Sequence, residues 1–234
     1  MQRRPVLAID IGGTKTLSAL VDGDSVLAQR RVETARDSGP QAWLDAVVAS
    51  TAEWRGRFGA AGIAVTGRIA EGRWSALNPA ILPVPDGYPL VAALTERLGV
   101  PVTAVNDAQA AAWGEYRFGA GRGADMVFMT VSTGVGGGLV LGGRLLTGRN
   151  GLAGHVGQIL TDLMAGEQRL EDVAAGSALA RLAAGSGPGR RSGGGSPDRW
   201  GGIPAGPCHA FLADAGRSGL FRHWWRPRPG RWLP

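Results

Sequence analysis

The sequence has almost no cysteine and no long apolar run. Cys208 is the single cysteine among 234 residues, which excludes an internal disulfide and fits a reducing cytoplasm. No apolar run reaches the ~18 residues that a membrane-spanning helix needs. Residues 1–5 lead directly into a strand-like run, without the small-residue cleavage site of a signal peptide. We therefore expect a cytoplasmic protein with no membrane partner.

Lysine is nearly absent as well, since Lys15 is the only one, and arginine supplies the remaining positive charge. The net charge of +6 comes entirely from residues 185–234, which hold eight Arg and two Asp, whereas residues 1–184 hold 17 basic and 17 acidic residues. A surface that binds polyanions would depend on this terminal segment alone. We therefore expect no nucleic-acid partner.

Short apolar runs alternate with helical stretches between residues 6 and 141. Helices are expected from Pro40 onward and over 90–98 and 108–116. This alternation predicts an α/β fold with layers around a mixed sheet. From about Gly185 the sequence is rich in Gly, Pro, Arg and Trp and shows neither a helix nor a strand period. The expected strands are 6–10, 16–21, 26–32, 61–66, 102–105, 126–131 and 139–141.

Two glycines follow the first expected strand, in the segment Asp10-Ile-Gly-Gly-Thr-Lys15. Glycine lets backbone N–H groups approach a polyphosphate closely, and the hydroxyl of Thr14 can add a hydrogen bond. An acid at a strand end can hold Mg²⁺ through water. Taken alone, the segment fits a tight hairpin better than a phosphate site.

A second glycine-rich loop, Ser132-Thr-Gly-Val-Gly-Gly-Gly138, follows the strand expected at 126–131. Its spacing matches neither a P-loop nor the dinucleotide fingerprint. Two such loops in one chain indicate a nucleotide held from both sides of a cleft. A glycine-rich hairpin is an equally good interpretation of this loop alone.

The pair Asn106-Asp107 stands between an expected strand and an expected helix. The carboxylate of Asp107 is well placed there as the general base for a substrate hydroxyl. A helix N-cap is the better interpretation of this pair alone, since Asp is common at that position. The combination of all three segments is much more specific.

With these segments the chain resembles the ROK family of bacterial sugar kinases over residues 6 to about 184, and it is most similar to the family's N-acetylmannosamine kinases. The resemblance implies a two-lobed actin-like ATPase (ribonuclease H-like) α/β fold, with residues 1–118 as the N-terminal lobe and 119–184 as an incomplete C-terminal lobe. It also implies ATP-dependent phosphorylation of N-acetylmannosamine at O6, as in sialic-acid catabolism. The matching segments are Leu77–Pro79, Val105–Glu115, Asp125–Phe128, Thr130–Gly138, Leu145–Gly148 and Gly151–His155.

The resemblance also implies a role for each matching residue. Asp107 would accept the proton of the C6 hydroxyl, and Asp10 would help to place Mg²⁺. The sugar would contact Asn78, Asn106 and His155, the last at a position where many relatives carry glutamate. A homodimer is a further implication, because the family often forms dimers. The ATP phosphates would be held by Gly12, Gly13, Thr14 and Lys15 on one side and by Thr133, Gly134, Val135, Gly136, Gly137 and Gly138 on the other.

The chain departs from the family at its zinc site. ROK kinases commonly hold zinc with one histidine and a cysteine-rich segment. Here Gln158 stands at the histidine position, and Leu163–Glu171 replaces the cysteines. Zinc needs about four nitrogen or sulfur ligands, so we expect no zinc to bind.

The terminal segment departs further, because the adenosine-binding elements of the relatives cannot be recognised in it. Around Trp224-Trp225, a reading frame displaced by one nucleotide must encode paired glycines, since tryptophan has a single codon. Our hypothesis is that residues 185–234 are a frameshifted remnant of the C-terminal lobe.

Three alternatives stand beside the leading function. They are a glucokinase or N-acetylglucosamine kinase of the same family, a sugar-responsive regulator, and a truncated protein that binds sugar without turnover.

Overall fold

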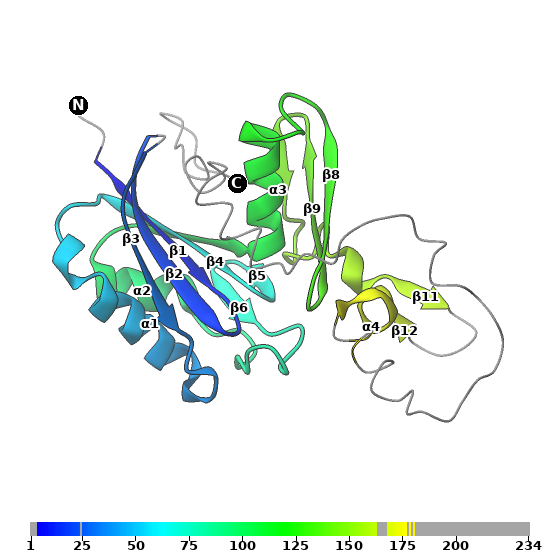
Figure 1. The fold of residues 1–234 in the computed structure, drawn as a ribbon, viewed down its shortest axis with the longest axis horizontal. Helices are drawn as coiled ribbons and strands as arrows, with labels where there is room; N and C mark the ends of the chain where they lie inside the picture. Colours follow the sequence, from blue (N-terminus) through cyan, green and yellow to red (C-terminus); the bar gives the residue numbers. More distant parts are fainter. Residues whose placement is uncertain (1–3, 24, 163–167, 177, 179, 181–234) are drawn as a thin grey trace.

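The computed structural model describes residues 4–23, 25–162, 168–176, 178 and 180 (Figure 1). The hypotheses about the segment from residue 185 onward lie outside these residues. The larger sheet has the strand order β3-β2-β1-β4-β7, in which β1, β4 and β7 run parallel while β2 is antiparallel to both of its neighbours. Its strands are β1 Val6–Ile11, β2 Lys15–Asp22, β3 Ser25–Glu33, β4 Ala60–Val65 and β7 Val102–Asn106.

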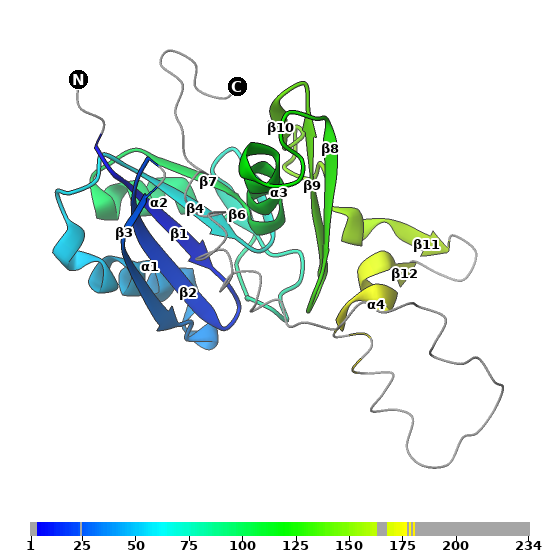
Figure 2. The same ribbon diagram turned by 45° about the horizontal axis from the view of Figure 1, so that its top comes forward.

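One face of this sheet carries the main hydrophobic core. Helices α1 (Gly39–Ser50) and α2 (Leu90–Leu98) cover that face, as Figures 1 and 2 show. Side chains alternate along a strand, so Leu7, Ile9 and Ile11 of β1 all point into this core. The same alternation turns Asp10 toward the opposite face, away from α1 and α2.

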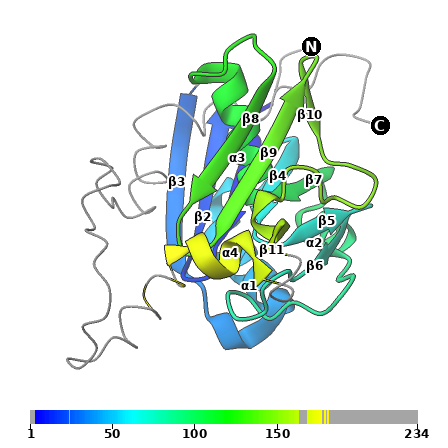
Figure 3. The ribbon, with the colours of Figure 1, turned by 90° about the vertical axis from the view of Figure 1, so that its right-hand side faces the viewer.

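A second sheet of three strands, ordered β10-β9-β8, packs against helix α3 (Asp107–Phe118). Figure 3 shows α3 behind the strands β8 (Met126–Val131) and β9 (Val135–Leu141), with β10 (Arg144–Leu146) beside them. The helix and β9 approach each other very closely. A Cβ atom added to Gly138 would lie only 2.5 Å from the Cβ of Ala112. Glycine is therefore required there by packing.

Shorter elements complete the described chain. A two-residue turn of Glu71 and Gly72, both with positive φ (50° and 74°), joins β5 (Arg68–Ala70) to β6 (Arg73–Ser75). None of the described helices is long and apolar enough to cross a membrane. The remaining elements are the 3₁₀ turns Arg36–Ser38, Ala52–Trp54 and Val156–Gln158, the strands β11 Leu160–Asp162 and β12 Gln168–Arg169, and helix α4 Leu170–Ala174.

The strands and helices expected from the sequence are present. The first helix begins within one residue of the expected Pro40, and all but one of the other elements have both ends within two residues of the expectation. The exception is β9. The sequence predicted a loop up to Gly138 and a strand only over 139–141, but the strand begins at Val135. That prediction was wrong because the glycines at 136–138 serve close packing within a strand, and only residues 132–134 form the turn.

Candidate active site

Two acidic side chains lie near the carboxyl ends of the parallel strands β1 and β7, which are separated by β4. Asp10 of β1 is level with Ala64 of β4, which is level with Val105 of β7. Asp107 follows two residues later as the first residue of α3. Strands two places apart in a sheet are separated by roughly 10 Å. The two carboxyl groups are close enough for the charge of Asp107 to raise the pKa of Asp10.

Both carboxyl groups have raised pKa values. Burial raises the pKa of Asp10 to about 7, and the neighbouring Asp107 adds to the effect. The pKa of Asp107 is raised to about 6 because surrounding protein desolvates its carboxylate, although the residue keeps an accessible surface. Hydrogen bonds from the amide of Ala108 and the side chain of Asn106 oppose that rise. A carboxylate that is reachable and has a pKa near 6 suits a general base.

The side chain of Asn106 fixes the start of α3. Its Oδ1 accepts hydrogen bonds from the amides of Ala108 (2.9 Å) and Gln109 (3.1 Å), which caps the helix. Its Nδ2 donates to the carbonyl of Gly67 (2.9 Å) and to Oδ1 of Asp107 (2.9 Å). Asn106 thus ties Asp107 to the helix and to Gly67, which follows β4. Its predicted contact with the sugar stays a prediction.

The first glycine segment forms the turn between β1 and β2. The amide of Gly12 donates to the carbonyl of Lys15 (3.0 Å), and Thr14 and Lys15 are exposed. A Cβ added to Gly13 would lie 2.9 Å from the side chain of Ile81, so this turn packs against the segment that follows Asn78. In the described part of the chain, the amides of Gly13 and Thr14 donate no hydrogen bond.

The second glycine segment forms the turn between β8 and β9. The amide of Ser132 donates to the carbonyl of Gly134 (2.7 Å). Within the residues that the structure describes, the amides of Thr133 and Gly134 donate no hydrogen bond. Gly136 packs against Ala108, the neighbour of Asp107, with 2.8 Å between the Cβ of Ala108 and an added Cβ. Two turns whose N–H groups have no acceptor among the described residues fit a polyphosphate.

Glu171 connects the second turn to the segment around Asn78. Its Oε2 accepts from the amide of Val135 (3.3 Å), and its Oε1 accepts from Nδ2 of Asn78 (3.4 Å). Glu171 could not be predicted as a site residue from the sequence. Glu171 and Asp172 are both acids in the first turn of a short helix, where acids are common, so the sequence does not distinguish them. Only the contacts across 93 and 36 residues distinguish the two acids.

His155 lies near Glu171, whose charge acts on the imidazole. Burial lowers the pKa of His155, while the nearby backbone of Gly151 and the charge of Glu171 oppose the effect. Its Nε2 is buried and is the one such side-chain atom without a hydrogen-bond partner in the described chain. A buried acceptor or donor without a partner is costly, which indicates that a ligand group belongs there.

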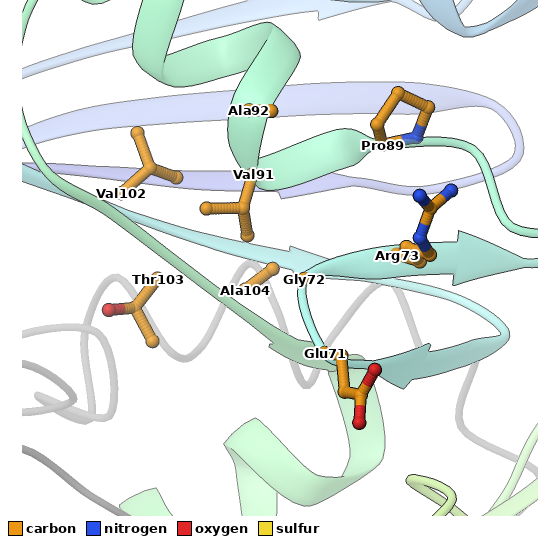
Figure 4. Close-up of a pocket in the computed structure, with 9 residues that line it drawn as sticks. All are labelled: Glu71, Gly72, Arg73, Pro89, Val91, Ala92, Val102, Thr103 and Ala104. Atoms are coloured by element: carbon orange, nitrogen blue, oxygen red, sulfur yellow. The ribbon is translucent and has the colours of Figure 1, made fainter.

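The contacts above link several of the predicted site segments to one another. Ile81 lies against Gly13, and Asn78 donates a hydrogen bond to Glu171. Glu171 accepts from the amide of Val135, which begins β9, and β9 packs on the helix that begins at Asp107. A recess of about 530 Å³ lies elsewhere, at the edge strand β7 (Figure 4). None of the predicted site residues lines it; its lining consists of Glu71, Gly72, Arg73, Pro89, Val91, Ala92, Val102, Thr103 and Ala104.

The predicted replacement of the zinc site can be followed in part. Oε1 of Gln158 accepts from Nη1 of Arg169 (2.9 Å), and the amide of Leu170 donates to the carbonyl of Ile159 (2.8 Å). Among the described residues, no three His, Cys, Asp or Glu side chains are grouped to hold a metal ion. Residues 163–167 lie outside the described chain.

The family follows from a match over most of the sequence. Residues 6–191 match the profile of the ROK family. The chain belongs to the ROK family. The predicted family is therefore confirmed, and so is the α/β fold of the actin-like ATPase type. A ROK family glucokinase from Streptomyces griseus, solved in complex with glucose and AMPPNP, is 36% identical and has a TM-score of 0.64, covering 76% of this chain and 60% of that one.

Two curated ROK relatives are more similar in sequence. The bifunctional enzyme NanE/NanK of Brucella melitensis biotype 1 is 53% identical over 177 residues, which is 76% of this chain and 34% of that protein. The N-acetylmannosamine kinase of Shigella boydii serotype 18 is 50% identical over 157 residues, which is 67% of this chain and 54% of that protein. The chain thus spans about one third to one half of the length of these relatives.

Proposed function

We propose that the protein transfers the γ-phosphate of ATP to the 6-hydroxyl of N-acetylmannosamine. The observation that carries the proposal is a pair of interacting acids, Asp10 and Asp107, together with two turns whose backbone amides donate no hydrogen bond within the described chain. The similarity to an N-acetylmannosamine kinase at 50% identity supports the choice of sugar. Because ATP is a cytoplasmic metabolite, the reaction belongs in the cytoplasm.

Each part of the site has a role in this reaction. Asp107 accepts the proton of the sugar hydroxyl and orients its oxygen toward the γ-phosphate. The amides of Gly13, Thr14, Thr133 and Gly134 donate to phosphate oxygens from the two sides. Asp10 is the residue that would hold Mg²⁺, which supplies charge neutralisation on the phosphates. Lys15 lies at the rim of the first turn, and Gly12 shapes that turn.

The sugar is held by groups on the other side of Asp107. Asn78, His155 and Glu171 are linked to one another by contacts or charge and present amide, imidazole and carboxylate groups. Together with Asn106, such groups suit the hydroxyls and the acylamino group of a hexosamine.

We also propose that the two lobes divide near Phe118. The glycines of β9, Gly136 to Gly138, act by letting α3 approach the strand rather than by binding phosphate directly.

A coupled ADP-release assay with a panel of sugars tests the proposal. The full chain should turn over N-acetylmannosamine faster than N-acetylglucosamine, mannose or glucose. Glucose turnover far above that of N-acetylmannosamine would move the assignment to a glucokinase of the same family. No ADP release with any sugar, together with no sugar binding by calorimetry, would contradict the proposed function.

A further inference from the structure

Gln109 is a buried polar residue next to the catalytic candidate. It lies on α3 two residues after Asp107, and only 1% of its surface is exposed. Its Nε2 donates to the carbonyl of Ala153 (2.9 Å) and to that of Gly151 (3.4 Å). Both acceptors are more than 40 residues away along the chain. The amide therefore attaches a distant segment to the helix that carries Asp107.

The segment that Gln109 holds has little regular structure of its own. Residues 147–155 contain neither helix nor strand, and Gly148, Gly151 and Gly154 all have φ between 72° and 82°. The amide of Ala153 donates to the carbonyl of Thr147 (3.0 Å), and Gly154 packs directly on the backbone of Gly138. The amides of Gly151 and His155 also donate within the segment, to the carbonyls of Gly148 (3.3 Å) and Leu152 (3.2 Å). These local bonds shape the segment, whereas the two donated by Gln109 attach it to α3.

His155 ends this segment, and its imidazole depends on the same carbonyl. The backbone of Gly151 lies close enough to the imidazole to raise its pKa, and Nε2 has no hydrogen-bond partner in the described chain, so Nδ1 is the nitrogen that faces this backbone. A neutral imidazole that donates from Nδ1 presents a bare lone pair at Nε2. The carbonyl of Gly151 thus connects the side chains of Gln109 and His155.

We propose that Gln109 is a positioning residue that, through the carbonyls of Gly151 and Ala153, orients His155 so that its Nε2 accepts a hydrogen bond from an N–H or O–H group of the sugar. This inference rests on the proposed function, because it takes His155 to face the sugar. It adds Gln109 to the site as a residue that contacts neither ATP nor the sugar. It also specifies that the sugar group facing His155 is a hydrogen-bond donor.

The substitution Gln109→Leu removes both donated hydrogen bonds at nearly constant volume. By analogy with outer residues that orient ligating histidines, we expect the dissociation constant for N-acetylmannosamine, measured by calorimetry on the full chain, to rise by about tenfold to a hundredfold. The KM for ATP should change by less than about twofold, because neither phosphate turn contacts Gln109. A combined loss in ATP KM and kcat with unchanged sugar affinity would overturn the proposal.

The substitution Thr51→Val is the matched control. Thr51 is also buried (3% exposed) and its hydroxyl donates to the carbonyl of Val47 (2.8 Å), but it lies at the end of α1, on the far side of the larger sheet. Thr51→Val should lower the Tm without changing sugar affinity. If Gln109→Leu behaves in the same way as Thr51→Val, Gln109 has a merely structural role and the proposal is wrong.

Hydrogen–deuterium exchange separates this inference from the proposed function. In Gln109→Leu, the amides of residues 147–156 should exchange faster, while those of the larger sheet should be unchanged. Unchanged exchange over 147–156 would overturn the positioning role even if the wild type phosphorylates N-acetylmannosamine. Conversely, a wild type that binds no sugar would contradict the proposed function, while the exchange data would still decide whether Gln109 holds the segment.

Discussion

At the scale of single residues, the protonation of Asp107 sets the pH dependence of the proposed reaction. A general base must be deprotonated, and surrounding protein raises the pKa of this carboxyl to about 6. We therefore expect kcat/KM to fall about tenfold per pH unit below pH 6 and to level off above it. A profile measured with saturating ATP tests this. A rate that stays constant down to pH 4.5 would contradict the role of Asp107.

Asp10 should link stability to pH in the opposite sense from most acids. Burial raises its pKa from 3.8 to about 7, so the folded chain binds this proton more tightly than the unfolded chain. The stabilisation is therefore complete below about pH 4 and is lost as the pH rises through 7. We expect Asp10→Asn to raise the free energy of unfolding at pH 8 by on the order of 4 kcal/mol, with little effect at pH 4. Urea unfolding measures both values.

The control for that experiment is Asp22→Asn, which alters an exposed acid at the far end of β2. It should leave the pH dependence of unfolding unchanged. If both variants shift stability at pH 8 equally, general charge repulsion and not the burial of Asp10 is the cause.

The sequence was sufficient to propose Asp10, Asp107 and the two turns as site residues, because an acid or a glycine pair at a strand end is a local pattern and the three segments together resemble the ROK family. It was insufficient for Glu171 and Gln109. Both act through hydrogen bonds to residues more than 30 positions away, and neither has a local feature that separates it from a helix-capping acid or a helix-interior glutamine.

At the scale of elements, the contact between α3 and β9 keeps the base beside the second turn. The substitution Gly138→Ala would bring a methyl group within 2.5 Å of Ala112 and 3.1 Å of the Cα of Gln109. Backbone on one side and a fully buried alanine on the other leave no flexible side chain to move aside. We expect a loss of about 1–3 kcal/mol in the free energy of unfolding.

Gly59→Ala is the matched control, since Gly59 does not have a positive φ and an added Cβ would meet only the exposed side chain of Arg4. Its cost should be well below that of Gly138→Ala in the same denaturation assay. Equal stability of the two variants would contradict the close packing of α3 on β9.

The elements were largely predictable from hydrophobic period and from glycine and proline at their ends. The start of β9 was not, because glycines indicate a loop when their neighbours in space are unknown. The short strands β5, β6, β10, β11 and β12 were also not predicted, since two or three residues carry no measurable period.

At the scale of the whole molecule, Glu171 joins segments that belong to the two halves of the site. Its bonds reach Asn78, which follows β6, and Val135, which begins β9. Glu171→Gln keeps the shape but removes the charge, which weakens both bonds and the field at His155. We expect the KM for N-acetylmannosamine to rise by about tenfold, corresponding to ~1.4 kcal/mol.

The neighbouring Asp172→Asn provides a control, since its exposed carboxylate caps α4 through the amide of Arg169 (3.1 Å). It should affect helix stability but leave sugar affinity unchanged. A sugar KM that responds equally to both substitutions would assign the effect to α4 as a whole.

The position of the transferred phosphate tests the central claim most directly. The full chain is incubated with Mg²⁺, N-acetylmannosamine and ATP labelled in its γ-phosphate, and the product is identified by ³¹P–¹H correlation NMR. The account predicts label on O6 alone, with the rate reduced by about 10²- to 10⁴-fold in Asp107→Asn. Label on another hydroxyl, or equal transfer by wild type and Asp107→Asn, would contradict it.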